Sequence, residues 1–494
     1  MSELPKGWTK ASFDLAGDYT DYVSNGSFAS LKENVTQTDV EDFAILLRLK
    51  DFNNSFSGDF KYITESSYNY LSKSKLEPGD LFLSNVGAPG KTFIIPDLKM
   101  PMSLAPNGIR VRASSITSNK YLHYFISSPV GGELIDSITG GNAQQKFNKT
   151  ALKKSELPLA PLNEQIRIVN KLDSILAKVD KAQARLDKIP AILKRFRQSV
   201  LAAATSGELT KEWRTLNVVP ETELEQIESY WQNELLRQGR KYKPYRYPQG
   251  DIDKLGWLPS KLGAICDVHV GSTPKRTEKT YWGGDVKWVS SSEVAFCEIF
   301  DTKEKITTLG LDNSSTRLHP PGTVMLAMIG QGKTRGQPAI LRAEACHNQN
   351  TAALRVPEPF LLSEYLYYFL WEKYEETRKI GGGNNQKALN KATVQSIDIS
   401  LPSIREQRAI VKKIERLFKK ANKVEKQYLE AKARLERLTQ SILAKAFRGE
   451  LVQQDPSDEP AEKLLERIWA EKEQRELKKT TRKRTKNAKT AEKE

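Results

Sequence analysis

The sequence repeats itself at a fixed interval, and this duplication limits the possible architectures more than any other feature. Gly141-Asn142-Ala143-Gln144 corresponds to Gly383-Asn384-Asn385-Gln386, 242 residues later, and the same interval joins Glu164-Gln165 to Glu406-Gln407. In the segments that precede these matches the interval drifts to 243 and 244. Each copy therefore has a variable first part and a closely matched second part. A two-copy chain can form a pseudo-twofold structure from one polypeptide.

The matched part of each copy has the apolar spacing of a coiled-coil helix. Apolar residues recur in a 4-3-4-3 pattern from Ile168 to Val200, and the second copy repeats the pattern from Ile410 to Ile442. A lone stripe of this kind favours an oligomerisation zipper. Two equal copies in one chain favour an antiparallel pair inside the chain instead. A helix of about 43 residues would be roughly 64 Å long, so it would also be a spacer.

The ends of these helices can be placed from capping residues. Asn163-Glu164 and Arg405-Glu406 suit the first turn of a helix. The glycines suited to a left-handed cap beyond the two ends are Gly207 and Gly449. Pro190 interrupts the first helix, whereas Lys432 stands at the same position of the second. We therefore expect a kink in the first helix and none in the second.

The variable parts, residues 1–150 and 255–392, are predicted to be separate domains of about 140 residues, a normal domain size. Short β-prone segments alternate with turn residues, and each domain ends with one Tyr-rich helix. The expected strands lie at 43–47, 80–84, 286–289 and 323–326, and the expected helices at 121–127 and 364–374.

The fold class expected is α/β (α+β): two variable domains of mixed β-sheet and helices, separated by two long antiparallel coiled-coil helices, in a pseudo-twofold tandem repeat. The expected boundaries are 1–155 for domain 1, 156–206 for the central helix, 207–254 for a linker with a short helix, 255–397 for domain 2, 398–449 for the C-terminal helix, and 450–494 for a short helix and a basic disordered tail. The linker is either a plain connection or a docking surface for a partner.

A glycine-rich polar loop closes each variable domain. Glycine lets a backbone approach a surface closely, Asn and Gln can bond adenine edges, and Lys can contact phosphate or guanine. The alternative is an ordinary flexible link into the helix, and the presence of the same loop in both copies favours function. The candidate residues are Asn142, Gln144, Gln145 and Lys146 in the first loop, and Asn384, Asn385, Gln386 and Lys387 in the second.

The second domain also contains Gly271-Ser272-Thr273-Pro274-Lys275-Arg276 and Tyr281-Trp282-Gly283-Gly284-Asp285-Val286-Lys287-Trp288. These segments, the two-copy layout and the glycine-rich loop leading into a Glu-Gln-x-x-Ile-Val helix resemble the specificity (S) subunit of type I restriction-modification systems. The resemblance covers nearly the whole chain. The first domain has Ser24-Asn25-Gly26-Ser27-Phe28 instead of these segments, a difference expected of two domains that recognise different half-sites.

The resemblance implies a DNA sequence-specificity subunit that binds an asymmetric bipartite site in duplex DNA. It implies two modification subunits that dock on the helices and methylate adenine with S-adenosylmethionine. It also implies restriction subunits that use ATP and Mg to translocate and cleave DNA. The chain itself would be non-catalytic and would bind none of these cofactors. Two alternatives are a stand-alone DNA methyltransferase or nuclease and a non-specific DNA-binding coiled-coil scaffold.

The charge balance agrees with a polyanionic partner. Lys and Arg number 77 against 61 Asp and Glu, a net charge of +16 with a pI near 9.4. Two Gly-Lys-Thr segments suggest a phosphate-binding loop, but the glycine that should stand five residues earlier is Asn85 or Ala327, and strand-like residues follow. Hairpins that contact DNA phosphates suit these segments better. The basic candidates outside the glycine-rich loops are Lys91, Lys275, Arg276, Lys333 and Arg335.

Other chemistry is not indicated. The three cysteines and four histidines show no metal-ligand spacing, and Cys346-His347 is predicted to be a core contact. No cofactor turn and no Asn-Pro-Pro-aromatic or Asp-Pro-Pro-aromatic segment is present. The odd number of cysteines, the absence of a leader pattern and the absence of a long apolar run predict a cytoplasmic protein with no membrane attachment.

Overall fold

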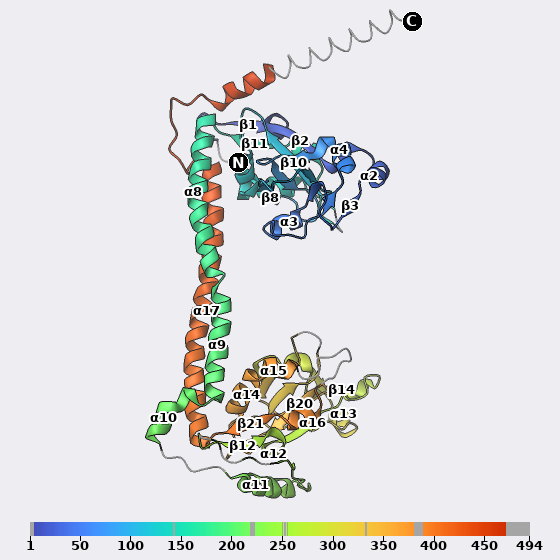
Figure 1. Ribbon diagram of the computed structural model, residues 1–494, viewed down its shortest axis with the longest axis vertical. Coiled ribbons are helices and arrows are strands. Elements are labelled where there is room, and N and C mark those ends of the chain that lie inside the picture. The colour runs from blue at the N-terminus through green and yellow to red at the C-terminus, as the bar shows by residue number, and fades with distance from the viewer. Residues whose placement is uncertain are drawn as a thin grey trace, which may run out of the picture. The chain divides into compact units, whose positions relative to one another are not determined.

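The computed structural model describes residues 4–141, 144–217, 223–248, 250, 253, 255–330, 333–379 and 389–470. The chain forms two compact units. Unit 1 is drawn from Met1–Asp187 and Leu429–Glu494, and unit 2 from Lys188–Tyr428. Each unit contains one of the two variable domains and stretches of the long helices (Figure 1). We describe each unit by itself.

Three sheets form the domain of unit 1. The inner sheet has the order β2-β10-β7-β8 and is antiparallel throughout, the second has the order β3-β5-β4-β9-β6, and β1 pairs with β11. The strand bounds are β1 Thr9–Ser12, β2 Gly17–Asp21, β3 Gln37–Thr38, β4 Ala44–Leu47, β5 Tyr62–Ile63, β6 Lys75–Leu76, β7 Leu81–Ser84, β8 Thr92–Ile94, β9 Met102–Leu104, β10 Gly108–Ala113 and β11 Glu156–Leu159.

The domain of unit 2 follows the same plan around a different second sheet. Its inner sheet has the order β13-β20-β17-β18-β15, its second sheet has the order β16-β14-β19, and β12 pairs with β21. The strand bounds are β12 Leu258–Lys261, β13 Asp267–Val270, β14 Trp282–Val289, β15 Cys297–Ile299, β16 Glu304–Ile306, β17 Val324–Ala327, β18 Pro338–Leu341, β19 Cys346–His347, β20 Thr351–Arg355 and β21 Asp398–Leu401.

The duplication predicted from the sequence therefore extends into the variable domains. The series β2-β10-β7-β8 and β13-β20-β17-β18 have the same order and the same antiparallel pairings. The four strands expected from the sequence are present as β4, β7, β14 and β17. The second sheets differ, and unit 2 adds β15 in parallel to the edge strand β18. The mixed helix and sheet fold in two copies is confirmed.

The domains hold more helices than the one apiece that we expected. The additional segments are short, and turn chemistry alone did not reveal them. The helices are α1 Phe13–Ala16, α2 Phe28–Asn34, α3 Leu49–Asn53, α4 Glu65–Tyr70, α5 Asn119–Ser127, α6 Pro129–Ile138 and α7 Lys149–Lys154 in unit 1, and α12 Leu262–Ile265, α13 Thr308–Asp312, α14 Ser363–Glu372, α15 Tyr374–Lys379 and α16 Lys391–Gln395 in unit 2. The Tyr-rich segments form α5 and α14, as predicted. The repeated Asn148 and Asn390 are N-caps of α7 and α16.

The long helices behave as the prolines and glycines predict. The first copy is broken into α8 (Leu162–Leu186) and α9 (Ile189–Thr205), while the second is one helix, α17 (Ile404–Phe447), of 44 residues. The break is where Pro190 lacks an amide hydrogen and its ring would crowd the carbonyl of Leu186. Gly207 and Gly449 follow the ends with φ of 77° and 72°, the left-handed conformation expected of a helix cap.

The coiled-coil seam is buried where the long helices pack in the core of each unit, and other seam residues are more exposed. In unit 1, Ile168 and Leu172 of α8 share a core with Phe447 of α17. In unit 2, Val200 of α9 shares a core with Ile414 of α17. The start of each helix thus packs with the end of the other copy, which is an antiparallel arrangement. Seam residues between these cores are more exposed; they include Phe196 (38% exposed), Val424 (42%) and Leu438 (46%).

The two long helices begin later than expected, and the linker packs on a domain. The helices begin at Leu162 and Ile404, because residues 156–159 and 398–401 are strands that complete each domain. The linker is not a free connection. Its helix α11 (Leu224–Arg237) buries Ile227 and Trp231 in the core of unit 2, and the Trp231 indole donates to the carbonyl of Ile265 at 2.8 Å. In unit 1 the helical residues 461–470 bury Ala461 and Leu464 in a similar way.

The remaining elements are one α-helix, α10 Lys211–Leu216, and short 3-10 helices: η1 Tyr22–Asn25, η2 Ser72–Ser74, η3 Glu208–Thr210, η4 Lys279–Tyr281 and η5 Ser291–Glu293.

A buried Glu-Gln pair attaches each domain to its long helix. In unit 2 the Gln407 amide donates to the carbonyls of Phe360 and Pro402 at 2.8 and 2.7 Å and accepts from the amide of Leu362. In unit 1 the Gln165 amide donates to the carbonyls of Ile116 and Ala160 at 2.9 Å. Both glutamines are buried, so their hydrogen bonds hold the domain backbone against the first turn of the helix.

The neighbouring glutamates differ between the units. Glu406 accepts hydrogen bonds from the Trp257 indole at 2.9 Å and the Thr210 hydroxyl at 2.6 Å, and it forms an ion pair with Arg214. Glu164 is also buried, and burial raises its pKa because Trp8 and Arg167 offset the loss of water only in part. The anchor of unit 2 is therefore the better compensated of the two.

Substitution of Glu406 by Ala should destabilise unit 2 selectively. It leaves Arg214 and the Trp257 indole without their buried acceptor, which costs roughly 3–5 kcal/mol for a broken buried pair. Amide hydrogen exchange during urea unfolding would report the two units separately. Glu415→Ala, an exposed glutamate on the same helix, is the matched control. An equal loss of protection in both units would contradict the assignment.

Candidate nucleic-acid interface

In unit 1 the structure brings the predicted loop residues onto a hairpin. Strands β7 and β8 pair antiparallel, and the loop between them ends at the exposed Lys91. Backbone bridges join Lys146 to Val86 and to Gly140, and the amide of Gly87 donates to the carbonyl of Gln145 at 3.1 Å. The exposed Gln144 lies over the same glycine, since a Cβ on Gly87 would be 3.7 Å from its Nε2. Asn142 lies outside the described residues.

A concave pocket of about 750 Å³ opens beside this loop. Phe28 is 78% exposed at its edge, a position suited to stacking, and the lining mixes aromatic, amide and ammonium groups. Three of the lining residues suited to binding were not predicted: Phe28, Asn85 and Asn107. Asn85 is the residue that breaks the phosphate-loop pattern, and Asn107 precedes a glycine and has φ of 74°. The residues that argue for binding are Phe28, Asn85, Asn107 and Lys146.

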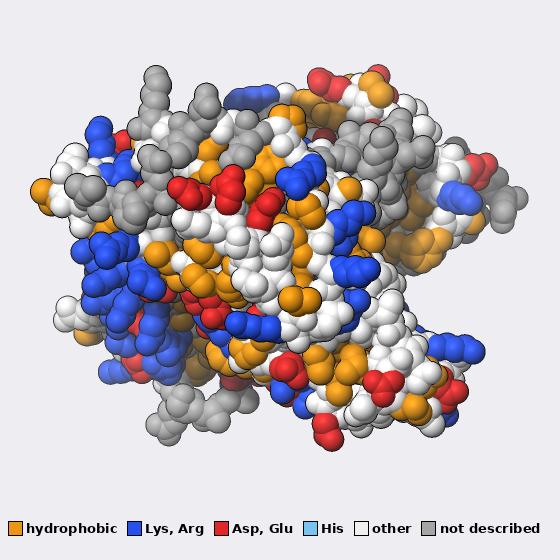
Figure 2. Space-filling view, turned by 90° about the horizontal axis from the view of Figure 1, so that it is seen from below, with side chains coloured by type: hydrophobic (Ala, Val, Ile, Leu, Met, Phe, Trp, Pro, Cys, Tyr) orange, Lys and Arg blue, Asp and Glu red, His pale blue; other side chains and the backbone are white. Residues whose placement is uncertain are grey.

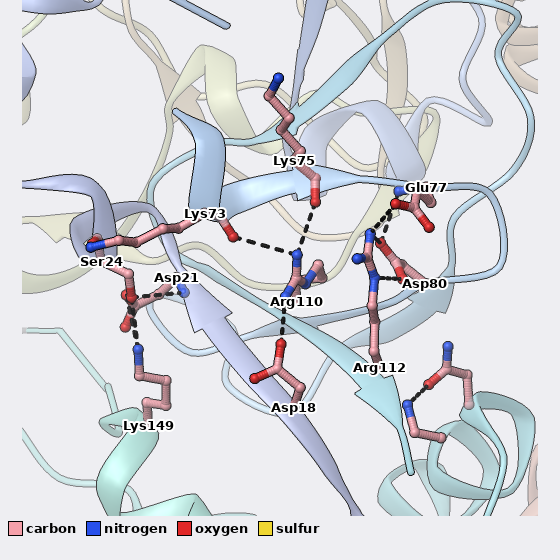
Figure 3. A network of polar contacts seen from close by, with 12 residues as sticks. Asp18, Asp21, Ser24, Lys73, Lys75, Glu77, Asp80, Arg110, Arg112 and Lys149 are labelled. Carbon is pink, nitrogen blue, oxygen red and sulfur yellow. Dashed lines mark hydrogen bonds and ion pairs between the residues drawn. The ribbon is translucent and has the colours of Figure 1, made fainter. Parts of the chain in front are cut away.

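A network of hydrogen bonds and ion pairs holds the segments around the pocket in place (Figure 3). The ammonium of Lys149 donates to the Ser24 hydroxyl at 2.8 Å and lies 3.3 Å from Asp21, so it anchors the Ser24–Phe28 segment. Arg110 on β10 donates to Asp18 at 2.6 Å and to the carbonyl of Lys75 at 3.1 Å, which ties the inner sheet to the second sheet. Lys149 and Arg110 thus have partners within the protein. The exposed residues of the pocket are the ones that remain to bind a ligand.

The neighbouring Arg112, also on β10, contacts two carboxylates next to β7 of the same sheet. Its guanidinium holds the buried Asp80 through two hydrogen bonds of 2.7 and 3.0 Å, and Glu77 lies 3.0 Å away (Figure 3). The two carboxylates raise the pKa of Arg112. Because Asp80 stands at the start of β7, this pair fixes the strand that leads into the pocket hairpin.

Unit 2 carries the equivalent hairpin between β17 and β18. Its loop holds the exposed Lys333 and the half-buried Arg335, whose guanidinium donates to the carbonyl of Arg378 at 2.5 Å. Arg335 therefore supports α15, and its contact with DNA stays a prediction. Strands, not helices, follow both Gly-Lys-Thr segments, which agrees with rejecting a nucleotide-binding loop. Asn384, Asn385, Gln386 and Lys387 lie outside the described residues.

Arg276 is also engaged within the protein. Its guanidinium lies 3.7 Å from the ring centre of Trp282 and 5.1 Å from that of Trp288, and it forms a two-point ion pair with Glu304. The two segments that carry the family resemblance thus pack on each other, while the adjacent Lys275 is exposed. Close packing requires glycine at two positions of these segments. A Cβ on Gly271 or Gly284 would collide with backbone carbonyl oxygens at 1.9 and 2.6 Å.

Three histidine rings lie next to one another in unit 2, with tilted interplanar angles of 49° and 51°. The ring centres of His269 and His319 are 5.5 Å apart, and those of His319 and His347 are 5.0 Å apart. Burial lowers the pKa of His319 to about 2 and that of His347 to about 4. The pKa of the nearby Asp267 is lowered, although burial alone would raise it, because His269 and Arg240 hydrogen-bond to it. As predicted, Cys346 and His347 are core residues.

Among the described residues, no group of three or more His, Cys, Asp or Glu side chains is placed to hold a metal ion. The exposed groups are instead amides, ammonium groups and an aromatic ring on loops of two related domains. Such an arrangement defines a duplicated nucleic-acid-recognition protein, with one interface in each unit.

Comparison with known proteins identifies the family. The family of the type I restriction modification DNA specificity domain matches residues 28–191 and 254–432. The chain is 32% identical over 397 residues to the type I restriction enzyme EcoBI specificity subunit of Escherichia coli, covering 76% of this chain and 77% of that protein. The StySPI specificity subunit of Salmonella potsdam is 25% identical over 98% of this chain and 99% of its own. The chain belongs to the type I restriction-modification specificity subunits.

A solved structure agrees at the level of the fold. A chain from a study of complex assembly and conformational transition of the type I R-M system superimposes with a TM-score of 0.65 at 17% identity. The match covers 91% of this chain and all of the other. The specificity-subunit fold expected from the sequence is thus confirmed, and the chain is a DNA sequence-specificity subunit.

Substitution of Glu304 by Gln should strengthen DNA binding. It removes the carboxylate that pairs with Arg276 and so frees a cation, and each further phosphate contact steepens the salt dependence of binding by about one unit. Titration of duplex DNA at several salt concentrations measures this. Glu298→Gln is the matched control, because its partner Arg342 keeps Glu364. Weaker binding by Glu304→Gln would show that the pair itself builds the interface.

Acidification should weaken unit 2 through its two buried histidines, His319 and His347. The unfolded state protonates its histidines below pH 6.5, whereas folded His319 and His347 stay neutral down to about 2 and about 4. Stability is therefore lost as pH falls, by about 2 kcal/mol for each histidine between pH 6.5 and 5. Urea unfolding at both pH values tests this, and His319→Phe should lose half of the dependence. An unchanged midpoint would refute it.

Proposed function

We propose that each domain recognises one half of an asymmetric, bipartite site in duplex DNA and that the chain performs no catalysis itself. The observation that carries this proposal is the pairing of one inner-sheet plan with two different second sheets and two different loop surfaces. A common scaffold with different loops suits the recognition of different base sequences. Phe28 and the pocket amides would serve the first half-site, and Lys275 with the β17–β18 loop would serve the second.

The partners follow from the family. The curated relatives are named as specificity subunits of type I restriction enzymes, which supports work with the other subunits of such an enzyme. We propose that two modification subunits dock on the duplicated helices and bring S-adenosylmethionine, and that restriction subunits bring ATP and Mg. The partly exposed seam residues support helix docking, since Phe196 and Val424 offer apolar surface that a two-helix coil leaves open.

Cytoplasmic residence is part of the same proposal. It is supported by the location of the DNA that the chain would bind. The three cysteines, which form no disulfide, also support it. None of the helices described in the structure is long and apolar enough to cross a membrane.

The length of the helices would set the number of unrecognised base pairs between half-sites. α17, with 44 residues, is roughly 66 Å long, longer than one turn of duplex at about 34–36 Å.

Two experiments separate this proposal from its alternatives. A stand-alone methyltransferase would transfer labelled methyl groups from S-adenosylmethionine to DNA with no partner present. A non-specific scaffold would select no bipartite motif from random duplexes. The proposal expects no turnover by the chain alone and a split motif from the selection.

Exchange of residues 13–155 for the same segment of another specificity subunit should change one half-site only. This segment leaves β1, Trp8 and the helix anchors of unit 1 in place. Mapping of methylated adenines in cells that carry the hybrid and its partner subunits gives the new motif. Exchange of residues 267–397 is the reciprocal control and should change the other half. A change in both half-sites from one exchange would contradict modular recognition.

A further inference from the structure

One face of α17 is a continuous cationic stripe. Seven exposed Lys and Arg side chains recur at helical spacing along its first half, and none of them forms an ion pair with another residue that the structure describes. They lie on the face opposite to the coiled-coil seam. Figure 2 shows Lys and Arg side chains gathered at the left, where the helices lie in Figure 1. The stripe consists of Arg405, Arg408, Lys412, Arg416, Lys419, Lys420 and Lys423.

The first copy of the helix provides an internal comparison. The seven residues of α8 that precede the stripe by 242 positions are exposed as well, but only two of them are basic. They are Asn163, Ile166, Asn170, Ser174, Ala177, Lys178 and Lys181. The stripe is therefore not required by the coiled coil, since the same outward positions serve a helix of the same kind without it.

The stripe opposes the stability of its own helix. Arg408 and Lys412, Lys412 and Arg416, and Lys419 and Lys423 are like charges four residues apart, which repel each other on a helix. Arg405 and Arg408 also stand near the positive end of the helix dipole. Charges that cost stability in the free protein and that the duplicate helix lacks indicate binding of a polyanion.

The composition of the stripe distinguishes between polyanions. It contains no Asn, Gln or aromatic side chain, so it offers neither amide contacts to adenine edges nor aromatic rings on which bases could stack. It contains no large apolar side chain and four lysines, whereas protein interfaces centre on aromatic and apolar anchors and are poor in lysine. Docking of two equal modification subunits would also need matching surfaces on both helices. Phosphate contacts, which need only charge, remain.

We propose that the face of α17 from Arg405 to Lys423 binds the phosphate backbone of duplex DNA outside the recognised half-sites, without regard to sequence. The proposal rests on the DNA-binding role of the chain and adds a second kind of contact to it. Its length of roughly 27 Å, from 18 residue steps, spans about eight base pairs of duplex at ~3.4 Å per step. The contact exists in one copy of the helix only.

The test copies the residues of α8 onto α17. The variant Arg405→Asn, Lys412→Asn, Arg416→Ser, Lys419→Ala carries side chains that the same chain already tolerates at the same positions of a helix. Binding of the full chain to a duplex that lacks its site would be measured over a range of salt concentrations. We expect about 10-fold weaker binding and a salt slope shallower by roughly 2 to 4 units, with an unchanged recognised motif.

A matched control separates the stripe from net charge. Lys171→Gln, Lys178→Gln, Lys181→Gln, Arg185→Gln removes four exposed cations from α8 and should leave both quantities nearly unchanged. Equal effects of the two variants would overturn the proposal, because charge alone would then explain them. Intact DNA binding with loss of the modification subunits on purification would also overturn it, by assigning the stripe to a protein. A parent chain that selects no motif would instead refute the recognition function.

Discussion

The fold depends on a glutamine and a glutamate that are buried at the first turn of each long helix. Gln165 and Gln407 each bridge two backbone carbonyls of the adjoining domain. A buried amide left without partners would cost more than a typical surface contact contributes, so domain and helix are ordered together. These residues explain why the sequence match is closest where the helices begin. They belong to the attachment of a domain, which any domain of this plan can use, and not to recognition.

The division between attachment and recognition explains the pattern of similarity between the two halves. Both domains share the strand order of the inner sheet, and both have a separate two-stranded sheet, β1–β11 or β12–β21, whose second strand directly precedes the long helix. The second sheets and their loops are free to differ. In unit 1, Lys149 fixes the Ser24–Phe28 segment, whereas in unit 2 two tryptophans and Glu304 hold Arg276. The halves solve the same problem of rigid loop support with different side chains.

Sequence reasoning succeeded where one residue type has one physical consequence. Pro190 had to break a helix, Gly207 and Gly449 had to follow helix ends, and the Gly-Lys-Thr segments had to be hairpins once a following helix was excluded. It could not show which partners a side chain takes within the protein. Arg276 and Arg335 carry charge that suits DNA, and no local pattern indicated that a carboxylate and indoles contact the first or that a backbone carbonyl accepts from the second. Asn85 and Asn107 meet at the pocket only through the pairing of β7 with β10, which no local pattern shows.

The net charge of +16 is also divided between distinct physical tasks. In unit 1, Arg110 and Arg112 neutralise acidic neighbours and hold sheets together, so they add little attraction for DNA. The seven residues of the stripe on α17 form no ion pair with another residue that the structure describes. Phosphate attraction acts without sequence and falls with salt, whereas amide contacts to base edges add specificity at little electrostatic cost. Keeping the two on separate elements lets a loop change its target sequence while the affinity for DNA as a polymer stays the same.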